Sequence, residues 1–218
     1  RARGTSGGGD WVATEKVHGA QLVVATDGAT VRVGKRKAWL SEGDVFFGWQ
    51  LLRAELERAA RRAHESAGGR GVLRVYGELY GGGYPHSDVP PVPGLSPVQT
   101  GVWYRPDLGF VAFDLLLEDG DDDGSFLSHD ELQRVAASSG LSTVPVLARG
   151  SRADVERHPT RFSTQVPSAL GLPELAENSA EGYVLKPAAA APPSRRVVFK
   201  KKIPDFDEAR FAAALAID

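Results

Sequence analysis

The stretch from Val72 to Tyr80 constrains the fold more than any other part of the chain, because its side chains alternate between apolar and polar. A period of two predicts a β-strand with one face against a core. Glu78 falls on the face that points away from the apolar side chains. Three glycines at 81–83 follow at once, and they allow backbone or a ligand to come close. We therefore predict a strand with a carboxylate on its polar side.

Other β-prone runs provide partners for this strand. The runs 22–26 and 30–33 are joined through Asp27-Gly28, a dipeptide favoured where a hairpin turn needs positive φ. Further strands are predicted at 110–117, 181–186 and 197–203. Phe113 shares a face with Val111 and Leu115 in the first of these, which by itself is typical of a core phenylalanine.

Helices are predicted in three places. Apolar residues recur at helical spacing from about Phe47 to Ser66, which indicates one long amphipathic helix. Ser128 and Glu131 have the spacing of a capping box at the start of a helix over 128–139, and a last helix is expected over 205–216. The proline-rich residues 84–107 are expected to form an ordered loop with little regular structure.

The length and composition favour one large domain of the α+β class. The chain has 218 residues, of which 42% are hydrophobic, so it can bury a sizeable core. We expect a flexible Gly/Ser/Arg-rich lead-in over residues 1–10 and a single domain over 11–218. No apolar run approaches the roughly 20 residues that cross a bilayer, which favours a soluble, cytoplasmic protein without a membrane partner.

Charge and residue types narrow the chemistry. The formal charge is −2, so any site for a polyanion must be a local patch. The chain has no cysteine, which excludes disulfides, thiolate metal sites and a cysteine nucleophile. The five histidines are scattered without zinc spacing, and there is no P-loop, Rossmann glycine pattern or serine elbow. Phosphate chemistry in this chain would therefore use lysines and carboxylates.

Two lysine-containing stretches are candidates for that chemistry. In Glu15-Lys16-Val17-His18-Gly19, a glycine three residues after Lys16 could let its amine and the backbone approach a phosphate. Near the end of the chain, a period of two places Lys200 and Lys202 on one face of a strand, where an anion between them would offset their repulsion. Solvent-exposed lysines are the alternative interpretation of both patterns. Arg36 in the basic cluster 34–40 either belongs to a solvated turn or reaches a phosphate.

Six motifs in order resemble those of the covalent nucleotidyltransferase superfamily. They are Glu15-Lys16-Val17-His18-Gly19, Gly34-Lys35-Arg36, Tyr76-Gly77-Glu78-Leu79-Tyr80-Gly81-Gly82, Val111-Ala112-Phe113-Asp114, Glu181-Gly182-Tyr183-Val184-Leu185-Lys186 and Phe199-Lys200-Lys201-Lys202. In detail they are similar to RNA ligases of the phage RNA ligase 2 and trypanosome editing-ligase type. The resemblance covers residues 11 to about 203. It implies an α+β nucleotidyltransferase domain of the ATP-grasp-like ligase adenylation type, with mainly antiparallel sheets flanked by helices.

The resemblance also implies roles for single residues. Lys16 would attack the α-phosphorus of ATP and carry AMP, while Lys200 and Lys202 would hold the phosphate and offset charge. Phe113 would stack on adenine, Glu78 would accept from a ribose hydroxyl, and Glu181 would help to position Mg²⁺ or Mn²⁺. The remaining nucleotide-binding candidates are Glu15, Val17, His18, Arg36 and Lys186.

In such ligases AMP then passes to an RNA 5′-phosphate, and an RNA 3′-hydroxyl displaces it, so the implied partners are RNA ends or a nicked duplex. Ala20 and Gln21 depart from the family's usual Ser or Thr and Asn after the motif lysine. No further C-terminal RNA-engaging domain is expected within these 218 residues. A DNA-joining or GTP-using enzyme, and a non-catalytic scaffold for nucleic-acid ends, are the alternatives.

Overall fold

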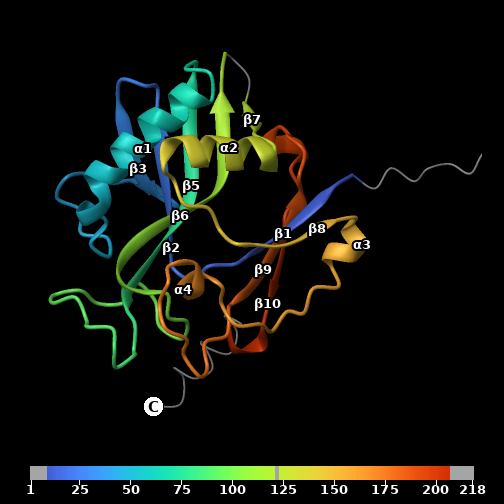
Figure 1. Cartoon of the computed structure of the whole chain (residues 1–218). Coiled ribbons are helices and arrows are strands. Elements are labelled where there is room, and N and C mark those ends of the chain that lie inside the picture. The colour runs from blue at the N-terminus through green and yellow to red at the C-terminus, as the bar shows by residue number, and fades with distance from the viewer. Residues whose placement is uncertain (1–8, 121–122, 207–218) are drawn as a thin grey trace, which may run out of the picture.

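A computed structural model describes residues 9–120 and 123–206 and shows two antiparallel sheets with helices at their sides (Figure 1). One sheet has six strands in the order β4-β3-β2-β5-β6-β7, and the other has four in the order β10-β9-β1-β8. Strands and helices thus occur in one α+β fold, as the sequence predicts.

The larger sheet is built around three long neighbours. Its strands are β2 (Ala20–Thr26), β3 (Val31–Lys35), β4 (Ala38–Trp39), β5 (Val72–Gly83), β6 (Arg105–Glu118) and β7 (Ser125–Phe126). The predicted hairpin joins β2 to β3, where Gly28 adopts a φ of 91° and an Asp27 carboxylate oxygen accepts from the Thr30 amide at 2.7 Å. Positive φ is available to glycine at little cost, which explains the residue at this turn.

The smaller sheet has β1 near its centre. Its strands are β1 (Trp11–Glu15), β8 (Val146–Gly150), β9 (Gly182–Pro187) and β10 (Phe199–Lys202). The chain leaves β1 at Glu15 and enters β2 of the other sheet at Ala20. Residues 16–19 therefore connect the two sheets, and Lys16 lies at the connection.

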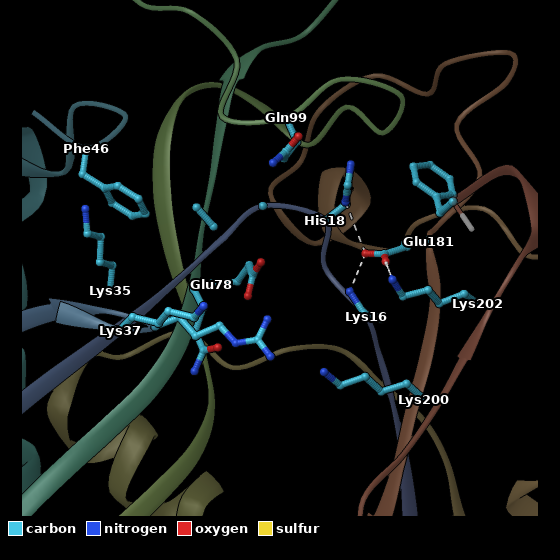
Figure 2. A pocket seen from close by; sticks show the side chains of 15 residues that line it. Lys16, His18, Lys35, Lys37, Phe46, Glu78, Gln99, Glu181, Lys200 and Lys202 are labelled. Carbon is cyan, nitrogen blue, oxygen red and sulfur yellow. Dashed lines mark hydrogen bonds and ion pairs between the residues drawn. The ribbon is translucent and has the colours of Figure 1, made fainter. Parts of the chain in front are cut away.

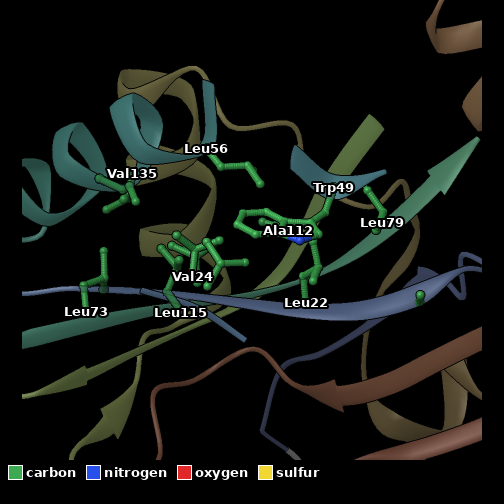
Figure 3. Close-up of a cluster of buried hydrophobic side chains, with 14 of the residues drawn as sticks. Leu22, Val24, Trp49, Leu56, Leu73, Leu79, Ala112, Leu115 and Val135 are labelled. Atoms are coloured by element: carbon green, nitrogen blue, oxygen red, sulfur yellow. The ribbon is translucent and has the colours of Figure 1, made fainter. Parts of the chain in front are cut away.

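Two helices cover one face of the six-stranded sheet and form the main core with it (Figure 3). They are α1 (Arg53–Ser66), entered through a 3₁₀ turn at Trp49–Leu52, and α2 (His129–Ser139). Leu56 of α1 and Val135 of α2 pack toward Leu73, Val75 and Leu115 of the strands. Ser128 and Glu131 form the predicted capping box at the start of α2.

The shorter elements and the chain ends complete the description. Two four-residue helices, α3 (Arg152–Val155) and α4 (Val166–Ala169), and 3₁₀ turns at Pro193–Arg195 and Pro204–Phe206 lie in the second half of the chain. Most of the predicted lead-in and most of the helix predicted over 205–216 lie outside the described residues. Within the described ranges, no helix has the length and apolar character needed to cross a membrane.

The prediction that Phe113 shares a face with both Val111 and Leu115 is wrong. Tyr76 pairs with Asp114 but the next residue, Gly77, pairs with Ala112, so Phe113 is an extra residue in β6. Such a bulge reverses the alternation of side chains along a strand. Phe113 packs with Val111 on one side of the sheet, whereas Leu115 belongs to the helix-covered core on the other.

The glycines after β5's polar row serve backbone packing. A Cβ at Gly81 would lie 2.2 Å from the Asp107 carbonyl oxygen, and one at Gly82 would lie 2.4 Å from that of Ser96. Both glycines also have φ near 90°. Of the two possibilities raised by the sequence, backbone or ligand, the backbone makes the close approach.

Candidate active site at the junction of the two sheets

A cleft of about 820 Å³ opens where the two sheets meet (Figure 2). Lys16 and His18 reach into it from the connection between the sheets, and Lys200 and Lys202 reach into it from β10. Glu78 enters from β5 on the opposite side. The fold thus brings into one space side chains from the connection that follows the first strand and from the last strand of the described chain.

Glu181 is the centre of the charged groups in the cleft. Its Oε2 lies 2.6 Å from Lys16 Nζ and 3.3 Å from His18 Nδ1, and its Oε1 lies 3.2 Å from Lys202 Nζ. The residue is only 2% exposed. Burial acts to raise the pKa of Glu181, but the hydrogen bond from His18 and the charge of Lys16 outweigh it and hold the pKa at about 2. Glu181 is therefore a fixed anion that orients the lysine.

The lysines of β10 have the arrangement that the sequence predicts. Lys200 and Lys202 both line the cleft, while Lys201 between them is exposed and does not. Phe199 anchors the strand by stacking on Trp11 of β1, with ring centroids 6.1 Å apart. Lys200 and Lys202 therefore point into the cleft from one face of β10, while Phe199 packs against Trp11 on the other face.

Glu78 lies in less polar surroundings than Glu181. Burial raises its pKa to about 7, although the charge of Lys16 and a hydrogen bond from the Gly19 amide oppose the shift. Gly19 also has a packing function. A Cβ at Gly19 would lie 2.1 Å from the Leu79 carbonyl oxygen and 3.0 Å from Glu78 Cγ, so the glycine admits the backbone of β5.

A second cavity, of about 220 Å³, continues from the cleft on the side of Phe113. Lys16, Gln21, Glu78 and Lys200 line both spaces. The inner cavity has an apolar part suited to a flat ring, and its apolar side chains are Val17, Phe113, Val144, Val184 and Val198. Phe113 lines this cavity from the side of the sheet that also carries Val111, and the bulge in β6 places Leu115 on the opposite side.

Lys186 lies at the far side of this inner cavity and is 4% exposed. Its Nζ donates to the Phe113 carbonyl oxygen at 2.5 Å and to an Asp114 carboxylate oxygen at 2.6 Å, and Arg196 binds the same oxygen. Burial lowers the pKa of Lys186, and the neighbouring Asp114 opposes that shift. Lys186 thus holds the Phe113 segment in place. Asp114 lies in a quoted motif, but neither it nor Arg196 was assigned a role from the sequence.

Glu15 and Val17 line the inner cavity but have structural contacts as well. The Glu15 carboxylate accepts hydrogen bonds from the Thr164 hydroxyl and from the Gln165 amide, the latter at 2.9 Å. Burial raises the pKa of Glu15 against these hydrogen bonds. The Val17 side chain is buried with Tyr80 and Val111. Glu15 and Val17 therefore set the course of the chain on either side of Lys16.

The other side of the cleft is basic, and its charged side chains come from the end of β3 and the turn between β3 and β4. Arg36 lines it, as proposed from the sequence, together with Lys35 and Lys37. Four more lining residues were not singled out as nucleotide-binding candidates from the sequence: Phe46, Gln99, Phe206 of the 3₁₀ turn Pro204–Phe206, and Gln21 of β2. Phe206 lies edge-on to His18 with ring centroids 4.9 Å apart, and the Tyr104 hydroxyl accepts from the His18 amide at 2.8 Å. Only the fold could reveal these long-range contacts.

The fit of a divalent cation rests on one carboxylate. Within residues 9–120 and 123–206, no group of three or more His, Asp or Glu side chains could hold a metal ion. Glu181 is ionised and faces the cleft, and Mg²⁺ is commonly bound by one or two carboxylates together with substrate phosphates and water. The residues present therefore fit a cation that arrives with a nucleotide, and Glu181 would be its protein ligand.

Fold and site together define a nucleotidyltransferase domain, with a lysine at the junction of two antiparallel sheets and a nucleotide-sized cavity beside it. The sequence comparison is more specific, since the model of the RNA ligase family matches residues 9–202. The chain therefore belongs to the RNA ligase family.

Two curated relatives agree with this assignment. The chain is 34% identical to RNA-editing ligase 2, mitochondrial, of Trypanosoma brucei brucei, over 91% of its length and 55% of the relative's. It is 31% identical to RNA-editing ligase 1, mitochondrial, of the same organism, over 81% of its length and 44% of the relative's. The chain thus spans about half the length of the curated relatives it matches.

Solved structures of an RNA ligase from Naegleria gruberi share the fold. A mutant of that enzyme without nucleotide matches with a TM-score of 0.64, over 94% of this chain and 52% of that one. Another mutant, solved with ATP and Mn, matches with a TM-score of 0.62, over 91% of this chain and 51% of that one. Both are 15% identical in sequence to this chain. These likenesses confirm the predicted nucleotidyltransferase fold.

Proposed function

We propose that this chain carries the adenylylating site of an ATP-dependent RNA ligase and that Lys16 becomes covalently bound to AMP. The observation that carries the proposal is the position of Lys16. Its amine lies 2.6 Å from the Glu181 carboxylate, which also binds Lys202 of β10, and it lines a cavity that Phe113 also lines. Family membership supports the same reaction class.

In the first step, Lys16 Nζ would attack the α-phosphorus of ATP. A nitrogen–phosphorus bond forms, the bond from the α-phosphorus to the bridging oxygen breaks, and pyrophosphate leaves. The attacking amine must first lose its proton, because only the neutral amine has a lone pair for the attack. Lys200 and Lys202 in the same cleft would bind the α-phosphate and offset the charge that develops on its oxygens.

The nucleoside would occupy the inner cavity. Phe113 would stack on adenine, held from behind by Lys186 and its ion pair with Asp114. Glu78 would accept from a ribose hydroxyl, His18 would touch the ribose, and Arg36 would bind a phosphate of the tail. All three residues line the cleft, which supports these roles. Glu181 would hold a divalent cation, which would supply positive charge to offset that of the phosphates. The choice between Mg²⁺ and Mn²⁺ stays open in this proposal.

The later steps would use RNA. AMP would pass from Lys16 to an RNA 5′-phosphate, and a 3′-hydroxyl would then attack that phosphorus and release AMP. The relatives named as RNA-editing ligases support RNA as the substrate. Gln21 lines both cavities, and its side chain is one methylene longer than that of the family's usual Asn. The single domain over 11–218 and the cytoplasmic location stay predictions from the sequence.

The test of the first step is incubation with radiolabelled ATP, GTP or NAD⁺, followed by denaturing electrophoresis. ATP should give a covalent label that Lys16→Ala abolishes. Lys201→Ala is the matched control, since that lysine lies on the same strand but faces away from the cleft, and it should label like the parent protein. Labelling by GTP alone, or a label that survives Lys16→Ala, would overturn the proposal.

The test of the later steps is a sealing assay on nicked duplexes with RNA or DNA on each side of the nick. We expect sealing when the 3′-hydroxyl strand is RNA. Sealing of DNA strands alone would favour the DNA-joining alternative. Tight binding of nucleic-acid ends without any labelling would favour the scaffold alternative.

A further inference from the structure

The helices α1 and α2 cover only one face of the six-stranded sheet, and the other face carries an unusual set of side chains. Strand pairing places Trp39, Gly34, Val23 and Tyr76 in one row across β4, β3, β2 and β5. The neighbouring row toward the cleft contains Gln21 and Glu78. Two residues along a strand correspond to about 7 Å, so the aromatic row lies about 7 Å from the row of Gln21 and Glu78, which line the cleft.

Trp39 is held in an exposed position on this face. A Cβ at Gly34 would lie 2.9 Å from Trp39 Cε3, so the absence of a side chain there leaves room for the indole ring. The Arg32 guanidinium lies 4.3 Å from the centre of the ring, and that of Arg74 lies 5.8 Å away. Trp39 is still 38% exposed. An indole braced by arginines on a bare sheet face is available to stack on a planar group.

A cavity of about 280 Å³ lies between Trp39 and Tyr76 and joins the main cleft. The two spaces share Gln21, Lys35, Arg36 and Lys37. No carboxylate lines this cavity, and in the described part of the chain Arg32, Arg36 and Lys37 form no ion pair with a carboxylate. The formal charge of the whole chain is −2, so this is a local basic patch on an acidic protein.

The geometry points to a subsite for the single-stranded RNA next to the end that reacts, with a base stacked on Trp39 and the backbone along Arg32, Arg36 and Lys37. Charge complementarity and continuity with the cleft favour nucleic acid as the occupant, and the aromatic rings favour an unpaired base over a duplex. This inference rests on the proposed RNA ligase function and extends it. The two neighbouring rows, one with Glu78 and the other with Trp39, would set the path of the RNA strand away from Lys16.

The test measures RNA binding and self-adenylylation separately. Binding of a fluorescently labelled 5′-phosphorylated single-stranded RNA is followed by anisotropy over a range of salt concentrations. Trp39→Ala should raise the dissociation constant for RNA about tenfold, since the loss of one base-stacking contact has an effect of this size. Arg32→Gln should weaken it less and lower the slope of the salt dependence by about one. Covalent labelling with ATP should be unchanged in both variants.

Arg58→Gln is the matched control, because it removes the same charge from exposed α1 on the covered side of the sheet. It should bind RNA like the parent protein. Parent-level RNA binding by both Trp39→Ala and Arg32→Gln would overturn the subsite. An equal loss on a fully paired RNA duplex would overturn base stacking as its basis. Failure of ATP labelling in the parent protein would instead overturn the proposed function, so the two failures are distinguishable.

Discussion

Glu78 is a residue whose charge state changes in the neutral pH range. Burial raises its pKa to about 7 from an ordinary 4.5, so the folded protein binds a proton there that the unfolded chain releases. The stabilising effect of this proton is complete below pH 4.5 and is lost as the pH rises through 7. Relative to Glu78→Gln, the parent protein should therefore lose about 2 to 3 kcal/mol of unfolding free energy between roughly pH 5 and pH 8.

Urea denaturation of both proteins at the two pH values measures this difference, and other titrating groups cancel in the comparison. Glu55→Gln, which changes an exposed carboxylate on α1, should show no such pH-dependent difference. An equal difference in unfolding free energy between Glu78→Gln and the parent protein at both pH values would show that the pKa of Glu78 is not raised in the folded protein.

Glu181 should control the response to metal ions. It is the cleft carboxylate that remains ionised at all neutral pH values, and its oxygens are already shared among Lys16, His18 and Lys202. Glu181→Gln should raise the Mn²⁺ concentration for half-maximal ATP labelling about tenfold or more. A Mn²⁺ titration of initial labelling rates measures this. Glu177→Gln changes an exposed carboxylate nearby in the sequence, and it should leave the titration curve unchanged.

Single residues show how far the sequence alone could lead. Lys16, Lys200 and Lys202 could be predicted because each short motif and the strand period involve residues close together in the sequence, and the order of the motifs along the chain supported them. The structure brings all three lysines to one cleft. The partners of Lys186 and Glu15 could not be found in this way. Asp114 lies 72 residues from Lys186, and Thr164 lies 149 residues from Glu15, so only the closed fold defines these contacts.

At the scale of elements, the junction between β1 and β2 depends on Gly19. A Cβ there would overlap the β5 backbone at Leu79 and press on Glu78. Gly19→Ala should therefore destabilise the protein by about 2 kcal/mol and also slow ATP labelling, because the connection that carries Lys16 must shift. Chemical denaturation and labelling rates measure the two effects.

Gly43→Ala is a suitable control for this substitution. Nothing lies within 4 Å of a Cβ at Gly43, and its backbone has no positive φ. The control should match the parent protein in both measurements. Full stability and full labelling of Gly19→Ala would show that β5 can yield and that the glycine is not required for packing.

The elements themselves were predictable where the signal is local. The hairpin at Asp27-Gly28, the capped helix α2 and the alternating strand β5 each follow from residues close together in sequence. The bulge at Phe113 was not predictable, because its cause is the register against β5 across the sheet. The same long-range pairing extends β6 back to Arg105, ahead of the predicted start at Phe110.

At the scale of the whole molecule, the site joins the two sheets. Lys16 and Glu78 belong to the connection and the larger sheet, whereas Lys202 belongs to the smaller one and Glu181 directly precedes its strand β9. A ligand that contacts both sets binds only the folded arrangement, so it must stabilise the protein against unfolding. ATP at a free concentration of about 100 times its dissociation constant would add about 2.7 kcal/mol to the unfolding free energy.

This coupling distinguishes covalent from reversible nucleotide binding. After incubation with ATP and a divalent cation, the desalted parent protein should keep a rise in melting temperature of about 5 °C, because AMP stays attached to Lys16. Lys16→Ala should return to the melting temperature of the free protein after the same desalting. Added pyrophosphate should reverse the parent's shift, since it attacks the phosphoramidate and regenerates ATP. Differential scanning fluorimetry measures all three states, and a shift that desalting removes from the parent protein would show that no stable Lys16 adenylate forms.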